Sequence, residues 1–225
     1  MNSSDENILV AIHCVTYNHE PYIRDCLEGF LMQKTNFKFV AIVHDDVSTD
    51  KTADIIREYA SKYPEIIKPI YETENQYSKF DGSLDRVMET AIAASGAKYV
   101  AMCEGDDYWI DPYKLQKQVD YLEQHEDCHL CFTDYKIKDG DKITEPEFAS
   151  GAFRAHNFEE HLLSRGYIAP MTWIYREKTW CVLNTYRTAI DTSFSMALEF
   201  FHYGSVGYLN DCTAVYLELK LKKTG

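Results

Sequence analysis

Short runs of β-branched and other apolar residues alternate with longer stretches in which apolar residues recur at helical spacing. The runs at residues 8–12, 39–43 and 99–103 have the length and composition of buried strands. The stretches at 22–33 and 83–95 carry apolar residues three and four positions apart, as one face of a helix requires. Strands that alternate with helices favour a mostly parallel sheet with helices on both faces. The sequence therefore predicts an α/β fold.

The rest of the chain continues this alternation and contains no repeat, low-complexity tract or linker. A chain of 225 residues is long enough for one well-buried core, so we expect one domain over residues 1–225. Ser48 or Thr49 is expected to cap a helix that ends near residue 62. Further strands are expected at 66–71, 128–135 and 214–216, and further helices at 113–125 and 195–203.

Polar residues follow three of the predicted strands. Residues 16–18 (Thr-Tyr-Asn) follow the first strand, and residues 45–46 (Asp-Asp) follow the second. Residues 104–107 (Glu-Gly-Asp-Asp) follow the strand at 99–103. In open parallel sheets, ligands bind outside the carboxyl ends of the strands. We therefore expect these three loops to meet in one crevice at that edge.

The segment 104–107 holds three carboxylates directly after a buried strand. Like charges this close repel one another, so one pKa should rise unless a cation neutralises them. Oxygen ligands suit Mg²⁺ or Mn²⁺, which takes phosphate oxygens and water as its remaining ligands. Gly105 lets backbone and ligand approach closely. From the residues alone, the alternative is a solvated acidic turn before the helix that follows Pro112.

The charge balance bears on the class of partner. The chain has 36 Asp and Glu against 23 Lys and Arg, a formal net charge of −13. Nucleic-acid binding needs clustered basic residues, and outside residues 220–223 no dense basic run occurs. A diphosphate can still bind if a divalent cation lies between it and the protein. The polar start and the lack of an apolar run of about 18 residues lead us to expect a cytoplasmic protein, with peripheral association with the inner face of a membrane left open.

Three spaced motifs resemble those of the family 2 glycosyltransferases, enzymes of the GT-A fold. The family pattern is Pro-Thr-Tyr-Asn, then Asp-Asp-x-Ser-Thr-Asp, then Asp-x-Asp, each after a strand. Here residues 15–18 are Val-Thr-Tyr-Asn, 45–50 are Asp-Asp-Val-Ser-Thr-Asp and 104–106 are Glu-Gly-Asp. Residues 105–118 resemble the bacterial branch of the family. The resemblance covers residues 8–135 and implies a GT-A-type, Rossmann-like domain.

The resemblance implies that the chain is divided between two substrates. Residues 1–135 would form the nucleotide-sugar-binding half, and residues 136–225 the acceptor-side half. In the first half, Thr16 and Tyr17 would line the base pocket, and Asn18 belongs to the same donor-binding loop.

The remaining donor-site roles are also implied by the resemblance. Asp46 would accept a hydrogen bond from the uracil imide of a UDP-sugar. Glu104 would hold the ribose, and Asp106 would bind the Mg²⁺ or Mn²⁺ that bridges the diphosphate. This chain departs from the family pattern at Val15, where the family has Pro, and at Glu104, which replaces the first Asp of Asp-x-Asp.

The resemblance further implies a catalytic base in the second half of the chain. The family uses an Asp near the start of a helix, and Asp191 is the best match. The alternative role for this residue is an ordinary helix N-cap, which Asp often provides before Thr-Ser. The later basic or His motif of the family is not visible, because Tyr216 is followed by Leu-Glu-Leu-Lys.

These residues imply an inverting transfer of sugar from a nucleotide-diphosphate sugar, with UDP-sugar expected, to a hydroxyl of a glycan or lipid-linked acceptor. Bacterial cell-surface polysaccharide assembly is the implied setting. A nucleotidylyltransferase would need a Gly-rich basic loop after the first strand, and a Rossmann dehydrogenase would need Gly-x-Gly-x-x-Gly there. Residues 16–21 contain no Gly. A non-catalytic nucleotide-sugar or glycan-binding module remains as the alternative, since a fold alone does not make a catalytic site.

Overall fold

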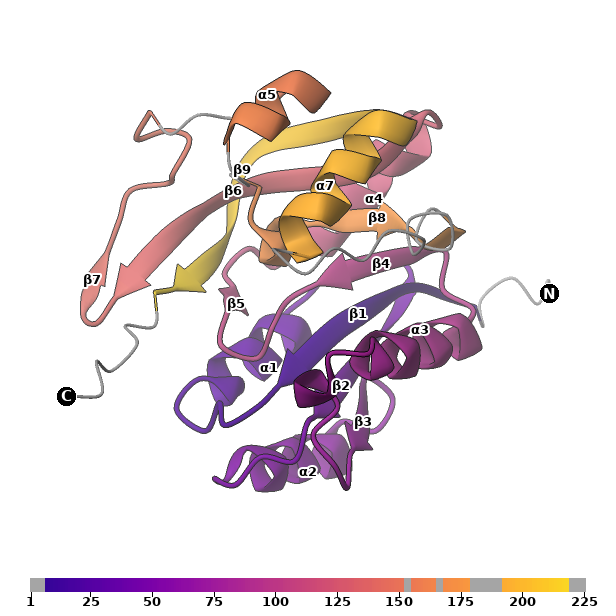
Figure 1. Cartoon of the computed structure of the whole chain (residues 1–225), viewed down its shortest axis with the longest axis vertical. Helices are drawn as coiled ribbons and strands as arrows, with labels where there is room; N and C mark the ends of the chain where they lie inside the picture. Colours follow the sequence, from indigo (N-terminus) through magenta and orange to yellow (C-terminus); the bar gives the residue numbers. More distant parts are fainter. Residues whose placement is uncertain (1–6, 152–154, 165–167, 179–191, 219–225) are drawn as a thin grey trace.

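The computed structural model describes residues 7–151, 155–164, 168–178 and 192–218. In these residues one sheet lies between two layers of helices (Figure 1). The strands are β1 (Ile8–Thr16), β2 (Lys38–Asp45), β3 (Ile67–Tyr71), β4 (Tyr99–Met102), β5 (Tyr108–Trp109), β6 (Cys128–Asp139), β7 (Lys142–Ile143), β8 (Ile174–Arg176) and β9 (Ser205–Leu217). The helices are α1 (Ile23–Leu31), α2 (Thr52–Lys62), α3 (Ser83–Ser95), α4 (Lys114–Gln124), α5 (Phe158–Ser164) and α7 (Thr192–Tyr203), with short 3₁₀ turns η1 (Tyr77–Lys79) and η2 (Pro170–Thr172).

The sheet has the strand order β3-β2-β1-β4-β8-β6-β9-β5, with β7 paired to β6. Strands β1 to β4 pair in parallel, whereas β8 runs antiparallel to both β4 and β6. Strand β9 is parallel to β6, so it runs in the same direction as β1. The predicted α/β fold with a mostly parallel sheet is therefore confirmed. The sheet runs through both predicted halves, and their division between donor and acceptor stays a prediction.

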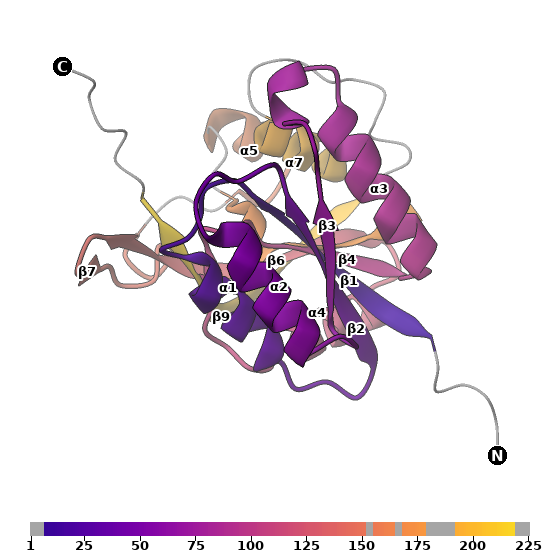
Figure 2. The ribbon, with the colours of Figure 1, turned by 90° about the horizontal axis from the view of Figure 1, so that it is seen from below.

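Helices cover both faces of the sheet, as predicted (Figure 2). On β1, Val10, Ile12 and Cys14 pack toward α1, α2 and α4, and Ala11 packs toward α3 and α7. Burial on both faces explains why the central strands are continuous apolar runs rather than alternating patterns. No helix in the described part of the chain is long and apolar enough to cross a bilayer.

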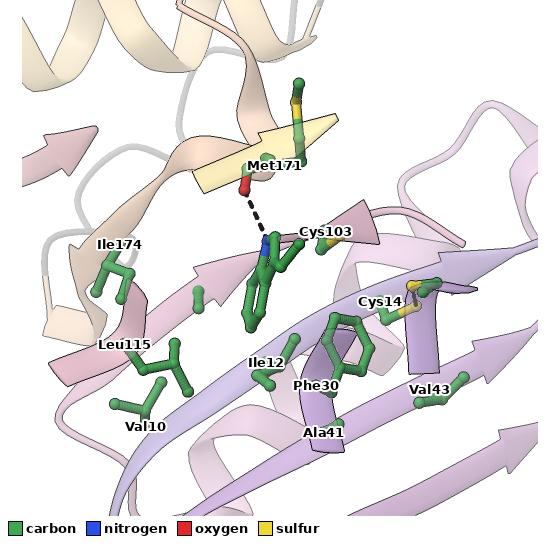
Figure 3. Packing of buried hydrophobic residues seen from close by; sticks show 14 of the residues in the cluster. Val10, Ile12, Cys14, Phe30, Ala41, Val43, Cys103, Leu115, Met171 and Ile174 are labelled. Carbon is green, nitrogen blue, oxygen red and sulfur yellow. Dashed lines mark hydrogen bonds between the residues drawn. The ribbon is translucent and has the colours of Figure 1, made fainter. Parts of the chain in front are cut away.

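Trp109 belongs to the core of the first helical layer. Its side chain is 2% exposed, its indole N–H donates to the Met171 carbonyl at 2.9 Å, and its ring meets Phe30 edge-on at 5.0 Å. Figure 3 shows this hydrogen bond among the buried side chains that surround it. The contact ties β5 to the chain before β8, so the segment after the acidic loop is held by both halves of the molecule.

The start of α2 differs from the prediction that Ser48 or Thr49 caps this helix. The helix begins at Thr52, and an Asp50 carboxylate oxygen accepts the Thr52 backbone N–H at 2.9 Å. Ser48 Oγ accepts the Asn18 N–H, and the Thr49 hydroxyl donates to the Asn18 side-chain oxygen at 3.2 Å, in the loop that follows β1. These two side chains connect the first two motif loops, and Asp50 takes the place of the expected cap.

Lys114 is an unusual member of the core because its side chain is fully buried. Its Nζ donates to Gln118 Oε1 at 2.6 Å and lies 4.6 Å from the centre of the Trp109 ring. Burial lowers the pKa of this ammonium group from 10.5 to about 7. The difference corresponds to about 4 to 5 kcal/mol between the charged and neutral forms.

We expect Lys114→Met to remove a rise in stability with pH. Below pH 7 the lysine is protonated in both states, and folding carries the full cost of burying the charge. Between pH 7 and 10.5 the unfolded chain keeps a proton that the folded chain has released, so the free energy of unfolding rises with pH. Urea unfolding from pH 7 to pH 10 should show this rise in the wild type and in Lys142→Met, an exposed control. An equal rise in Lys114→Met would contradict the assignment.

Candidate donor and metal site

Strand β4 ends directly before the acidic loop of residues 104–107. Glu104 is exposed, the Asp106 side chain is 20% exposed and Asp107 is buried. The Asp107 carboxylate accepts the backbone N–H of Leu217 at 2.9 Å, which fastens the loop to the end of β9. Asp106 is thus the carboxylate between an exposed and a buried neighbour, and it is open to a ligand.

Two of the three carboxyl groups in this loop, Glu104 and Asp107, have raised pKa values. Protein atoms crowd Glu104 although water reaches its side chain, and this crowding, together with the Asp106 carboxylate, raises the Glu104 pKa to about 7. Burial raises the pKa of Asp107 well above its usual range, and the Asp106 carboxylate adds to the effect. The predicted repulsion within the segment is therefore present. A divalent cation would oppose it by favouring the ionised forms.

The loop after β1 is bound to the loop after β2. Thr16 is buried, and its hydroxyl donates to the His44 carbonyl at 3.0 Å. Asn18 has a left-handed backbone with φ 56°; its N–H donates to Ser48 Oγ at 2.9 Å, and its side-chain oxygen accepts the Thr49 N–H at 2.7 Å. Tyr17, between them, is 47% exposed. Of the three predicted donor-site residues in this loop, Tyr17 presents most of its surface to a ligand.

Asp46 organises the loop that follows β3. Its two carboxylate oxygens accept the backbone N–H groups of Gln76 at 2.6 Å and Tyr77 at 3.0 Å. The side chain of Asn75 also donates to the Asp46 carbonyl at 3.1 Å. Asp46 therefore holds η1 against the end of β2 and is itself only 3% exposed. Its predicted contact with uracil stays a prediction, beside a loop-holding role that the sequence pattern did not indicate.

The loop after β2 contains backbone strain. Val47 adopts a left-handed conformation with φ 64°, which is rare for a β-branched residue. Such conformations cost on the order of 1–3 kcal/mol and are kept only where the surroundings enforce them. Here the contacts of Asp46 on one side and Ser48 on the other enforce it. Strain of this kind concentrates at functional sites.

The acidic loop touches the loop after β1 at Gly105. The Gly105 N–H donates to the Val15 carbonyl at 3.0 Å. A Cβ at position 105 would lie 2.5 Å from Thr16 Cγ2 and 2.9 Å from His19 Nδ1, closer than real Cβ atoms approach. Glycine is therefore required for the approach of the two loops. The three motif loops meet at the carboxyl edge of the sheet, as the parallel-strand rule predicted.

Two further residues lie beside the predicted site. His19 Nε2 is 3.9 Å from Asp106 Oδ2. Burial lowers the pKa of His19, against the effect of the Asp106, Asp50 and Asp45 carboxylates. Tyr216, on β9, is half-exposed; burial raises its pKa, and the nearby Asp107, Asp106 and Glu104 carboxylates add to this. Neither was identified from sequence, although His19 directly follows the Thr-Tyr-Asn motif.

Asp191, the predicted base, lies outside the described residues. The described chain resumes at Thr192, the first residue of α7. Glu199, farther along α7, is a half-buried carboxylate, and burial raises its pKa. The role of catalytic base stays a prediction for Asp191, and Glu199 is the second carboxylate to test.

The acidic loop fits a hard divalent cation held mainly by substrate. Among the residues that the structure describes, no group of three or more His, Cys, Asp and Glu side chains is arranged to hold a metal ion. A site with one protein carboxylate, completed by diphosphate oxygens and water, is the usual arrangement for Mg²⁺. Asp106 fits this arrangement, because it is partly exposed and, among the described residues, the side chain that lies within 4 Å as an ion-pair partner is His19 rather than a competing ammonium group.

Comparison with known proteins assigns the chain to a family. The profile of glycosyl transferase family 2 matches residues 11–183, a stretch that contains all three motif loops. The chain belongs to glycosyl transferase family 2. The resemblance of its motifs to this family is thereby confirmed.

Relatives of this family 2 glycosyl transferase include proteins from bacteria and archaea. The uncharacterised protein Rv1520 of Mycobacterium tuberculosis is 37% identical over 169 residues, which cover 75% of this chain and 47% of that protein. The uncharacterised glycosyltransferase MJ1057 of Methanocaldococcus jannaschii is 30% identical over 163 residues, covering 68% of this chain and 52% of that protein. The chain thus spans about half the length of these curated relatives.

Solved structures confirm the GT-A fold of this family 2 glycosyl transferase. Staphylococcus aureus TarS 1–349 in complex with UDP-GlcNAc superposes with a TM-score of 0.70 at 20% identity, covering 96% of this chain and 60% of that one. The mannosyltransferase PcManGT from Pyrobaculum calidifontis, in complex with GDP-Man and Mn²⁺, superposes with a TM-score of 0.66 at 16% identity. That match covers 97% of this chain and 59% of PcManGT.

Proposed function

We propose that this glycosyltransferase moves a sugar from a UDP-sugar to a hydroxyl of a glycan or lipid-linked acceptor, with inversion at the anomeric carbon and with Mg²⁺ or Mn²⁺ bound at Asp106. The observation that carries the proposal is the meeting of the three motif loops at the carboxyl edge of the sheet, with the partly exposed Asp106 carboxylate in the acidic loop. TarS in complex with UDP-GlcNAc and PcManGT in complex with GDP-Man and Mn²⁺ share the fold, so both support a nucleotide-sugar donor; TarS supports uridine as its base and PcManGT supports the metal.

The first two loops would hold the nucleoside. Tyr17 is exposed and would pack on the base, while Thr16 and Asn18 keep the loop in place through the contacts described above. A carboxylate offers about four acceptor positions. Asp46 uses two for Gln76 and Tyr77, and the uracil imide would use one of the remaining two. Glu104, on the acidic loop, is exposed and would accept hydrogen bonds from the ribose hydroxyls.

Asp106 would hold the cation, with His19 beside it and Asp107 fastened below the loop. When bound, the divalent cation supplies a positive charge that stabilises the departing diphosphate. The chain is acidic overall, at −13, and would otherwise repel a diphosphate. A carboxylate at position 106 that is accessible to the cation is therefore needed.

Asp191 would remove the proton from the acceptor hydroxyl as the oxygen attacks the anomeric carbon. The attack comes from the face opposite the diphosphate, so one displacement inverts the configuration. A positioned carboxylate is needed because an alcohol is a poor nucleophile at neutral pH. We place the reaction in bacterial cell-surface polysaccharide assembly at the cytoplasmic face of the membrane.

A thermal-shift panel of nucleotides and nucleotide-sugars, with and without Mn²⁺, tests the donor class. We expect UDP and UDP-sugars to raise the unfolding temperature in the presence of Mn²⁺ and to do so much less in EDTA. A larger shift with GDP or GDP-mannose would show that the donor nucleoside is guanosine and not uridine. Equal shifts with and without Mn²⁺ would show that donor binding does not need the metal.

A further inference from the structure

His19 lies beside Asp106, the proposed metal ligand. Its Nε2 lies 3.9 Å from Asp106 Oδ2, and the two side chains are 17% and 20% exposed. At this distance the contact is electrostatic rather than a hydrogen bond. The contact joins the imidazole to Oδ2, one of the two carboxylate oxygens of Asp106.

The backbone around His19 is fixed independently of any ligand. The His19 carbonyl accepts the N–H groups of Tyr22 and Ile23, each at 2.9 Å, at the start of α1. The next residue, Glu20, donates its N–H to the Asp50 carboxylate at 3.0 Å. The imidazole is therefore carried by a loop that is bound to both α1 and the loop after β2.

The ring nitrogens of His19 have different surroundings. Nδ1 is buried without a hydrogen-bond partner and faces Gly105, where a Cβ would lie 2.9 Å away. Buried N–H groups without a hydrogen-bond partner are rarer in proteins than buried acceptors without one, which indicates that the unpartnered N–H is the more costly of the two. The neutral tautomer with hydrogen on Nε2 is therefore favoured, and the protonated ring also carries hydrogen there. In either form, an N–H faces Asp106.

We propose that His19 is a positioning residue for Asp106: its Nε2–H attracts Oδ2, which would leave Oδ1 free to bind the divalent cation. The proposal rests on the proposed function, because it assigns His19 a role only if Asp106 binds a cation. Outer partners of this kind orient metal ligands in many proteins, and their loss costs about 10- to 100-fold in metal affinity. Gly105 is part of the same arrangement, since a side chain there would displace the imidazole.

The test is Mn²⁺ binding by the full chain in the presence of UDP, measured by electron paramagnetic resonance for three variants. His19→Gln places an N–H near the position of Nε2, His19→Asn places one near Nδ1, and His19→Leu has none. We expect His19→Leu and His19→Asn to lose about 10- to 100-fold in Mn²⁺ affinity, and His19→Gln to stay within a few-fold of wild type. His156→Leu, at an exposed histidine, is the matched control and should bind like wild type.

Each other outcome contradicts a different part of the account. If His19→Gln loses as much Mn²⁺ affinity as His19→Asn and His19→Leu, and its apo unfolding temperature is normal, an N–H near Nε2 is not what matters. His19 then acts only as a packing residue. If His19→Leu binds Mn²⁺ like wild type, the positioning role is wrong and the proposed function stands. A ¹⁴N hyperfine coupling in the wild-type Mn²⁺ spectrum that disappears in His19→Gln would make His19 a direct ligand. If the wild type binds no Mn²⁺ with UDP, the metal-assisted function fails, and this inference fails with it.

Discussion

Replacement of Asp191 by Asn is expected to leave donor affinity near that of the wild type and to reduce sugar transfer about 10²- to 10⁴-fold. The reason is that a carboxylate can accept the acceptor's proton, whereas a carboxamide of the same shape cannot. Donor binding should be spared, because the proposed donor contacts lie on the loops after β1, β2 and β4. Single-turnover transfer and calorimetric titration with UDP, measured on the same preparation, separate the two effects.

The competing role of Asp191 as a helix N-cap predicts the opposite pattern. Asn caps a helix about as well as Asp, so the substitution would be nearly silent in both stability and transfer. Near-normal transfer by Asp191→Asn, measured with the true acceptor, would therefore exclude the base role. Glu199→Gln is the matched variant, since Glu199 is a half-buried carboxylate on α7. We expect it to retain transfer; a large loss there would move the base to Glu199.

Replacement of Asp106 by Asn is expected to abolish the Mn²⁺-dependent stabilisation by UDP and to leave the apo protein folded. Asp106 is a partly exposed carboxylate of the acidic loop, whereas Asp107 is buried and bound to Leu217. A ligand present at 100 times its Kd stabilises a protein by about 2.7 kcal/mol, and the variant should lose this whole gain. Asp141→Asn, in the exposed turn between β6 and β7, is the control and should keep it.

The result for Asp106 depends on comparing the two metal conditions. Unfolding is followed with UDP in Mn²⁺ and with UDP in EDTA. If Asp106→Asn shows the full Mn²⁺-dependent shift, the metal is held elsewhere. If its apo unfolding temperature falls sharply, Asp106 supports the loop, and the more conservative Asp106→Glu then decides whether an ionised group restores the shift.

The parts of the fold that could be predicted from sequence are those fixed by local pattern. Helix α3 runs from Ser83 to Ser95 as expected, because its apolar spacing is regular and Gly96, with φ 71°, ends it. Strands β1 and β2 were recognisable because burial on both faces leaves an unbroken apolar run. The three-residue strand β8 was not predicted, since it is too short to show a period and forms only by pairing with β4 and β6.

Strand β9 shows why the second half was harder to predict than the first. Only residues 214–216 were expected as strand, whereas β9 extends over Ser205–Leu217. Its pairing with β6 is irregular, with register shifts between Thr133 and Tyr135. Gly207 packs against the Tyr121 ring. This part of the strand therefore depends on packing against a distant residue and not on local strand preference.

The candidate site divides in the same way. The meeting of three loops followed from the rule that parallel strands end at one edge, and this needed only the strand positions. The contacts that hold each side chain in place join residues far apart in the sequence, so the sequence pattern did not reveal them. The Asp46 carboxylate binds the backbone of residues 76 and 77, and His19 approaches Asp106 across Gly105. Such contacts join residues that are about 30 and 90 positions apart in the sequence.

The central claim, that this chain catalyses nucleotide-sugar-dependent transfer, is tested most directly by release of nucleotide from a panel of nucleotide-sugars. We predict that the wild type releases UDP from at least one UDP-sugar in Mn²⁺, slowly to water and faster with a hydroxyl acceptor. EDTA or Asp106→Asn should abolish the release. Nucleotide-sugars that bind the protein but are never turned over above the protein-free rate, with any metal or acceptor, would contradict the claim and indicate a non-catalytic binding module.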